Sequence, residues 1–387
     1  MMAASAIAMP ADDDIGEMLR KSVQDFCARH PGVARTRRLR DTEPGFDPGV
    51  WRQMAEAGWT GIPLPEAVGG LGLGLAEICV VAEELAADLA SEPFGPATVA
   101  ALAIAGGDNA GLKQRLLPAI ASGELIASLA WQESANTLDA LHPATRLKNA
   151  GGRLVLTGEK HFVPGAAGAG GFVVTAAAAD GTVLVWVEAG SGGLSREATL
   201  AVDGSMLSTL RFDRVEVADA DILASQTATS LLLPRLLDEA AVIATAELLG
   251  IIRAAFERTR EYLGQRTQFG RPIGSFQVLQ HRLVDLWMQR EMVRACLEEA
   301  IAACGQADET QRALAASAAK ARAATAALHN GRQSIQLHGA IGYADEHDIG
   351  LYLKRAIVKS AWMGSAPVHR KRFARLSGYV PQEAGEE

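Results

Sequence analysis

The sequence predicts an α+β protein built from an N-terminal helical domain, a central small β-barrel or sandwich, and a C-terminal four-helix bundle. Three observations indicate this order. Helical patterns with short Gly and Pro interruptions come first, short β-type runs between glycines follow, and long alanine-rich stretches complete the chain. We place the three domains at residues 1–124, 125–225 and 226–387.

The N-terminal domain starts its helical pattern at about residue 15. Residues 50–58, VWRQMAEAG, are amphipathic and stop at a glycine, which is a common helix terminator. Residues 61–78 are rich in Pro and Gly and indicate a loop that leads into another helix. The GGLGLG stretch within them resembles a phosphate loop. It follows no clear strand and lacks the Lys-Ser/Thr ending, so we interpret it as an ordinary loop.

The β domain is indicated by four short runs of β-forming residues that are bounded by glycines. These runs are residues 153–157, 171–178, 182–188 and 207–212. Several short strands separated by regular turn signals are typical of a small barrel or sandwich.

The C-terminal domain contains two long helical patterns. Residues 274–304 repeat apolar side chains at a period close to that of a helix, and residues 317–337 carry many small side chains that allow close helix packing. Such broad apolar faces predict a helical bundle that shares surface with other subunits.

Composition narrows the class of protein. Of the 387 residues, 49% are apolar and 21% are charged, so the chain can bury large cores. A net charge of −8 argues against a nucleic-acid partner, because such proteins need a basic surface. Four cysteines without a CxxC pair indicate free thiols in a cytoplasmic protein. The N-terminus lacks the features of a signal peptide, and no stretch predicts a membrane span.

The most specific segment is residues 261–286, EYLGQRTQFGRPIGSFQVLQHRLVDL. It places arginine, aromatic and amide side chains around a Gly-Arg-Pro-Ile-Gly turn. This set suits an adenine dinucleotide, because arginine binds a diphosphate, an aromatic covers a ring face and amides bind polar edges. An ordinary pair of helices joined by a turn, with Ser275 as a cap, is the alternative that the residues alone leave open.

Residues 266–277, RTQFGRPIGSFQ, closely resemble the flavin-binding turn of acyl-CoA dehydrogenases. Three more segments resemble segments of that family in the same order: PEAVGGLGL at 65–73, FDRVEVADADIL at 212–223, and QLHGAIGYADEHDIGLYLKRA at 336–356. The resemblance spans roughly residues 14–376.

The resemblance implies that FAD lies between subunits, with its flavin on the β domain and its ADP half reaching a neighbour. Glycine at position 339 would let backbone N–H groups approach phosphate oxygens, and Ala340 replaces the family's second glycine. By position, the residues of the C-terminal domain that would contact FAD are Arg266, Gln268, Phe269, Phe276, Gln277, Gln336, Gly339 and Ala340.

The β domain departs from the family's pattern in the flavin pocket. Gln132 lies in Trp-Gln-Glu-Ser, where the family usually has Thr-Glu-Pro-Gly. Phe162 and Pro164 occupy the Lys-x-Trp-Ile-Thr position. Phe162 can still cover a flavin face, but Pro164 offers neither the hydroxyl nor the N–H of threonine. A relaxed pocket or a division of labour with a second subunit would explain these departures.

The catalytic base also departs from the family's pattern. Met363 occupies the position of the family's commonest glutamate, and Ala240 occupies the minority position. Glu247 lies about two helical turns beyond Ala240 and is the only charge in residues 240–252, so we take it as the base. Burial raises carboxylate pKa values toward the range used in proton abstraction. Glu239 is the runner-up, although it points about 100° away from Ala240. The alternative for Glu247 is a structural ion pair with an Arg or Lys of another helix.

The resemblance therefore implies an enzyme, an FAD-dependent acyl-CoA dehydrogenase that forms a 2-enoyl-CoA and passes electrons to an electron-transferring flavoprotein. It implies a homodimer, a homotetramer, or a heterotetramer with a related subunit, and paired members act on bulky or unusual acyl-CoAs such as sterol side chains or dicarboxylates. The alternatives are a non-catalytic or flavin-sharing subunit and, more weakly, a flavin oxidase or monooxygenase. No metal site is predicted, because His338 and His347 lack ligand spacing.

Overall fold

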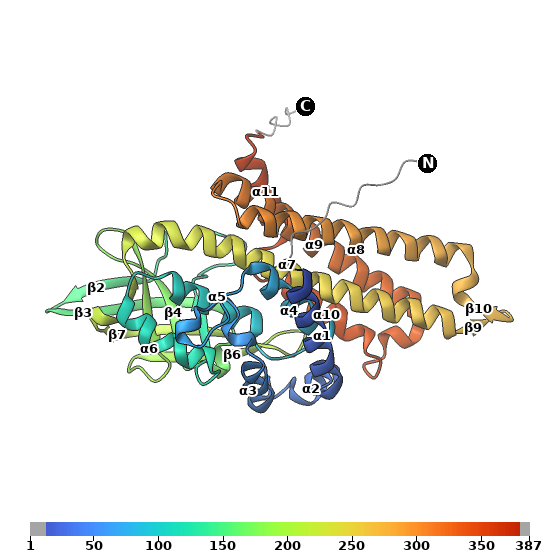
Figure 1. Ribbon diagram of the computed structural model, residues 1–387, viewed down its shortest axis with the longest axis horizontal. Helices are drawn as coiled ribbons and strands as arrows, with labels where there is room; N and C mark the ends of the chain where they lie inside the picture. The colour runs from blue at the N-terminus through green and yellow to red at the C-terminus, as the bar shows by residue number, and fades with distance from the viewer. Residues whose placement is uncertain (1–12, 380–387) are drawn as a thin grey trace.

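The computed structural model describes residues 13–379. The molecule is elongated (Figure 1): the large sheet lies at one end of the long axis, a two-stranded hairpin lies at the other, and long helices connect them. The N-terminal residues for which no signal peptide is predicted lie almost entirely outside the described range.

Within residues 13–379, six α-helices precede the sheet. They are α1 (Asp13–Arg29), α2 (Gly32–Leu39), α3 (Pro48–Glu56), α4 (Leu75–Ala87), α5 (Phe94–Gly106) and α6 (Ala110–Ala121). The helix predicted over residues 50–58 is confirmed as α3. Its first turn is capped by Asp47, whose carboxylate accepts hydrogen bonds from the N–H groups of Gly49 and Val50. The chain turns away at Gly58, where φ is 81°. Residues 69–74 form irregular backbone, as predicted for a loop.

One eight-stranded sheet follows, with strand order β6-β7-β3-β2-β4-β5-β8 and with β1 beside β4. The four predicted runs lie in β3, β4, β5 and β7, and their apolar side chains form a core of their own. The sequence did not single out β1, β2, β6 and β8. The strands are β1 (Ala127–Ala130), β2 (Arg146–Ala150), β3 (Arg153–Pro164), β4 (Gly171–Ala177), β5 (Thr182–Glu188), β6 (Leu194–Leu200), β7 (Met206–Val217) and β8 (Ile222–Ala224).

Five helices form the C-terminal bundle, and the hairpin of β9 (Thr267–Gln268) and β10 (Arg271–Pro272) joins the first two. The helices are α7 (Gln226–Gln265), α8 (Gln277–Cys304), α9 (Glu309–His338), α10 (Ile349–Ala361) and α11 (Ala366–Leu376). The helix predicted from residue 274 begins later, because residues 273–275 form a 3-10 turn. The helix predicted over 317–337 extends back to Glu309, where the side chain of Asp308 caps it.

The largest core joins the N-terminal helices to α7, α9 and α10. All four cysteines are free, as predicted. Element type changes close to residues 124 and 225, and the domain boundaries placed there stay predictions. Across residues 13–379, no helix has the length and apolar character needed to cross a membrane, and no cluster of three potential metal ligands occurs.

Candidate functional site

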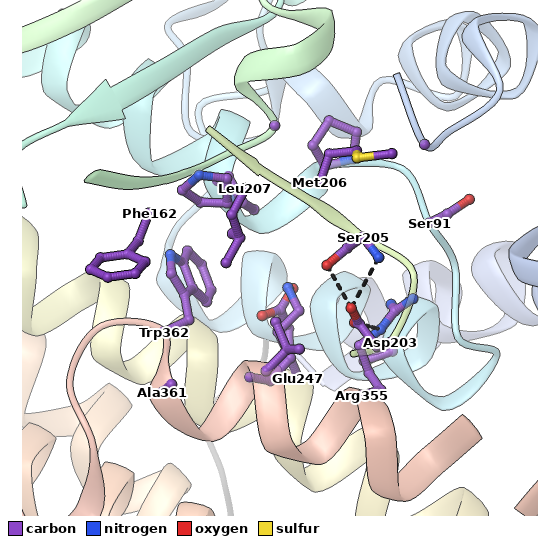
Figure 2. A pocket seen from close by; sticks show the side chains of 18 of the residues that line it. Ser91, Phe162, Asp203, Ser205, Met206, Leu207, Glu247, Arg355, Ala361 and Trp362 are labelled. Carbon is purple, nitrogen blue, oxygen red and sulfur yellow. Dashed lines mark hydrogen bonds and ion pairs between the residues drawn. The ribbon is translucent and has the colours of Figure 1, made fainter. Parts of the chain in front are cut away.

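The cavity that contains Glu247, called the main cavity below, has a volume of about 390 Å³ and lies where the N-terminal helices, the sheet and the bundle meet. Side chains from α4, α5, α7, α10 and the β6–β7 turn line it, and most of them are apolar. Figure 2 shows Glu247 between an aromatic pair, Phe162 and Trp362, and a polar group that includes Asp203 and Arg355.

The aromatic end of the cavity contains the predicted flavin residues of the β domain. Gln132, Phe162 and Pro164 all line the cavity, and the ring of Phe162 is 47% exposed. Phe162 and Asn136 have positive φ angles of 56° and 61°, although neither is glycine. Strained backbone of this kind collects at functional sites, because only a demanding local geometry maintains it.

An ion pair between a buried lysine and a half-buried glutamate holds the loop that carries Gln132 and Asn136. Lys160 is fully buried, and its Nζ lies 2.7 Å from Glu133 Oε1 and 2.8 Å from Thr175 Oγ1. Burial lowers the pKa of Lys160 to about 8. Burial alone would raise the pKa of Glu133, but hydrogen bonds from Lys160 and Thr145 lower this pKa to about 2. These contacts therefore anchor the loop at the aromatic end of the main cavity.

Glu247 lies on α7 and is 6% exposed. Its Oε1 accepts a hydrogen bond from Lys359 Nζ at 2.8 Å, and among the described residues its Oε2 has no hydrogen-bond partner. Lys359 also lies over the ring of Trp362, 4.7 Å from its centroid. Glu247 thus lines the cavity and forms the ion pair that was the alternative for it, while its role as the base stays a prediction.

Glycine at position 95 makes room for Glu247. A Cβ added to Gly95 would lie 2.9 Å from Glu247 Oε1 and 3.0 Å from the Trp362 ring. Position 95 must therefore lack a side chain if the carboxylate is to keep its place. Sequence reasoning missed this glycine, because nothing local distinguishes it from other helical glycines.

The polar end of the cavity was also missed. Arg355 Nε lies 2.6 Å from Asp203 Oδ2, and both residues are buried. The amide and hydroxyl of Ser205 donate to Asp203 Oδ1 at 3.0 Å and 2.6 Å. This cluster ties the β6–β7 turn to α10 and gives the apolar cavity one polar end.

The other base candidates lie elsewhere. Glu239 forms an ion pair with Arg235 at 2.8 Å and is not among the residues that line the main cavity. Ala240 is fully buried. Met363 is buried in the turn after α10 and lines a small adjoining cavity.

The predicted cofactor residues of the bundle lie at the far end from the sheet (Figure 1). Phe269 forms the tip of the β9–β10 hairpin and is 91% exposed. Its ring meets Phe276 edge to face at 6.1 Å, and Arg271 lies over Phe276 at 4.3 Å. Arg266, Gln268 and Gln277 are exposed beside them. These side chains form a solvent-facing surface of charge, amides and aromatic rings.

Gln336, Gly339 and Ala340 are exposed at the same end of the bundle. The end of α9 is held there by a small core in which Leu337 packs with Leu263 of α7. His338 is buried in this region and stacks on Tyr262 at 4.4 Å, which agrees with a packing role. The structure thus brings the predicted residues together in two groups, one at the main cavity and one at the hairpin end.

A second cavity of about 830 Å³ lies between residues 136–142, α7 and α11. Lys371, Arg372 and Arg375 give its α11 wall a basic character. It begins at Asn136, which also lines the main cavity, so the two cavities adjoin at this residue.

Comparisons with known proteins identify the family of the chain. The family model for the acyl-CoA dehydrogenase N-terminal domain matches residues 14–124, and that for the C-terminal domain matches residues 232–377. Acyl-CoA dehydrogenase IpdE2 of Mycobacterium tuberculosis is 32% identical over 343 residues, which are 88% of this chain and 90% of that protein.

Solved structures are similar over most of the chain. A variant of the Tcur3481–Tcur3483 steroid ACAD is 33% identical with a TM-score of 0.86, and the match covers 94% of this chain and 98% of that one. The ChsE4–ChsE5 complex from Mycobacterium tuberculosis is 25% identical with a TM-score of 0.84, covering 97% and 99%. With both domain models matched and this similarity along most of its length, the chain belongs to the acyl-CoA dehydrogenase family and is an FAD-dependent oxidoreductase.

Proposed function

We propose that this chain carries out the α,β-dehydrogenation of a bulky acyl-CoA with Glu247 as the base, and that it works beside a related subunit. The observation that carries the proposal is the buried carboxylate of Glu247 at the wall of an apolar cavity, between the aromatic end and the polar end. Neither position that the family more often uses for its base bears a proton acceptor here.

The residues present fit FAD. Phe162 offers an exposed ring for a flat isoalloxazine face, and the amides of Gln132 and Asn136 suit polar ring edges. Arg266 and Phe269 suit a diphosphate and an adenine. They lie at the opposite end of the molecule from the sheet, so they would serve a cofactor held by a neighbouring protomer. FAD, when bound, supplies the acceptor for the β-hydride.

Glu247 is placed to take the proton from the carbon next to the thioester carbonyl. In this step the α C–H bond breaks, its electron pair stays on the substrate and the proton passes to the carboxylate. Oε1 is held by Lys359, which leaves Oε2 as the acceptor that faces no competing donor among the described residues.

The cavity suggests the class of substrate. Its walls are largely apolar, but Asp203, Ser205 and Arg355 give one end polar character. A fused-ring or branched acyl group with a polar substituent would suit such a cavity better than a plain alkyl chain. The similarity to a steroid ACAD supports this proposal. We further propose an electron-transferring flavoprotein as the electron acceptor.

The proposed test replaces Glu247 with glutamine, which keeps the shape and removes the proton acceptor. Anaerobic addition of a ring-bearing acyl-CoA should bleach the flavin of the wild-type protein, together with any partner subunit that it needs. Glu247→Gln should retain FAD and lose bleaching by at least about a thousandfold. Glu239→Gln is the matched control on the same helix and should bleach normally. Bleaching by Glu247→Gln at the wild-type rate would remove Glu247 from the reaction.

A non-catalytic or flavin-sharing subunit is the second candidate. Pro164 favours it, because proline offers no N–H to the flavin edge at a position that lines the cavity. In that case the purified chain would be colourless, and a partner-bound form would bleach equally well with and without Glu247.

A further inference from the structure

Lys320 lies in the middle of α9 and is completely buried. Its ammonium group donates hydrogen bonds to three backbone carbonyls: those of Lys359 at 3.3 Å, Ser360 at 3.0 Å and Gly364 at 3.0 Å. None of these acceptors is a carboxylate. Burying a cation costs free energy unless it is hydrogen-bonded. The three carbonyls need a donor, which explains why this position carries a lysine and not an apolar side chain.

The three carbonyls belong to the end of α10 and the turn that follows it. The last carbonyls of a helix have no partner within the helix, and the helix dipole places negative charge there. The turn also contains Met363 and Gly364 with positive φ angles of 56° and 95°. From the other side, His369 Nε2 lies 2.8 Å from the Met363 carbonyl oxygen. Lys320 and His369 therefore hold an unfavourable turn from two directions.

The same turn forms one wall of the main cavity. Ala361, Trp362 and Gly364 line the cavity, and so does Lys359 at the start of the turn. Because Lys359 pairs with Glu247 and lies over Trp362, any movement of the turn would change the surroundings of the base.

Three titratable groups face Lys320 from the helices packed around it. They are Glu247 of α7, Lys359 of α10 and His369 of α11. Burial lowers the pKa of Lys320 to about 7, with Lys359 acting in the same direction and Glu247 opposing it. The lysine is thus part of one buried charge cluster with the base.

We propose that Lys320 is a positioning residue for dehydrogenation: it clamps the turn after α10 and so fixes the Lys359–Glu247 ion pair. This inference rests on the proposed role of Glu247. Loss of the clamp lets Lys359 withdraw, and Glu247 Oε1 then loses the hydrogen bond that fixes its position.

The test compares Lys320→Met with Arg312→Met in the flavin-loaded protein with any partner it requires. Arg312 is a matched control, because it is a buried cation of the same helix that pairs with Asp238 at 3.1 Å, away from the turn. Lys320→Met should lower kcat at least about tenfold with KM within about threefold. Arg312→Met should change melting temperature alone.

Hydrogen exchange gives a readout that does not depend on turnover. Amides of residues 359–366 should exchange faster in Lys320→Met and at the wild-type rate in Arg312→Met. If Lys320→Met does not fold, Lys320→Gln, which keeps one amide donor, is measured against the same criteria. An unchanged kcat together with unchanged exchange in the folded variant would overturn the proposal. Normal bleaching by Glu247→Gln would instead refute the proposed base, so the two failures are distinguishable.

Discussion

The imidazole of His369 lies beneath the turn after α10 and is 1% exposed. Burial lowers its pKa from 6.5 to about 3, and the nearby cations Lys320 and Arg372 act in the same direction against the bond to the Met363 carbonyl. The folded pKa is below the unfolded one, so between these values only the unfolded chain binds the proton. Stability is therefore lost as pH falls from about 6.5 toward 3.

This residue gives a prediction for acid stability. His369 should cost the folded state about 2 kcal/mol at pH 5 relative to neutral pH. Melting temperatures of the wild type should fall across pH 7 to 5. His369→Gln should melt lower at pH 7 but show a flatter decline. His142→Gln, a change at an exposed ring, is the control and should follow the wild-type curve. Parallel curves for wild type and His369→Gln would contradict the assignment.

The sequence could identify Glu247 but not its surroundings. A lone charge in an apolar helix is visible in the sequence, and so is its spacing from Ala240. Its partner Lys359 is 112 residues away, and Gly95 comes from a third helix, so no local pattern links them. The Asp203–Arg355 pair was missed for the same reason. Contacts between distant segments depend on how the helices pack, and a single sequence has no periodic pattern that predicts this packing.

At the scale of elements, α7 and α4 approach each other closely. A Cβ added to Gly250 would lie 2.0 Å from the Glu83 carbonyl oxygen, so only glycine allows this contact. Arg253, one turn further along α7, pairs with both Glu83 and Glu84 of α4 at 3.1 Å and 2.8 Å. The two helices are thus joined by backbone contact and by charge, and α7 is held in the register that points Glu247 into the cavity.

Two glycines of α7 provide a matched pair of variants. Gly250→Ala should destabilise the protein by about 1 to 3 kcal/mol, because the backbone of α4 must move. Gly264→Ala, on the same helix with nothing within 4 Å of the added Cβ, should be neutral or stabilise by up to about 1 kcal/mol. Chemical denaturation with a flavin and a tryptophan signal measures both. Equal effects would show that the α4–α7 contact is looser than described.

Long helices and apolar strands were predictable because their periodicity is strong. The four β runs found from the sequence lie in the strands that supply most side chains of the sheet core. β6 was missed because nearly all of its residues are exposed, so no alternation marks it. β1 has four buried residues in a row, too few for a recognisable pattern. The type of these elements could be predicted from the local sequence pattern. Exposed edge strands and short strands could not, because they form only where another strand pairs with them.

At the scale of the whole molecule, the cofactor residues lie in two groups, one at the main cavity and one at the hairpin end (Figure 1). Phe269→Ala removes a ring that is 91% exposed, so the fold should not change. Flavin retention should fall several-fold, because base- and ring-stacking contacts contribute about 1 kcal/mol or more each. The flavin-to-protein ratio after gel filtration measures this. Leu231→Ala, an exposed apolar change on α7, is the control and should keep its flavin. Full retention by Phe269→Ala would contradict a cofactor role for the hairpin.

Because the hairpin is separate from the main cavity, two variants of the chain with different defects can complement each other. If two identical chains face each other, mixing a Phe269→Ala chain with a Glu247→Gln chain rebuilds one complete centre per mixed pair, from the cavity of the first and the hairpin of the second. The mixture should then be more active than the two proteins measured separately. If the neighbour is instead a different gene product, mixing adds no activity, and the assay distinguishes the two assemblies.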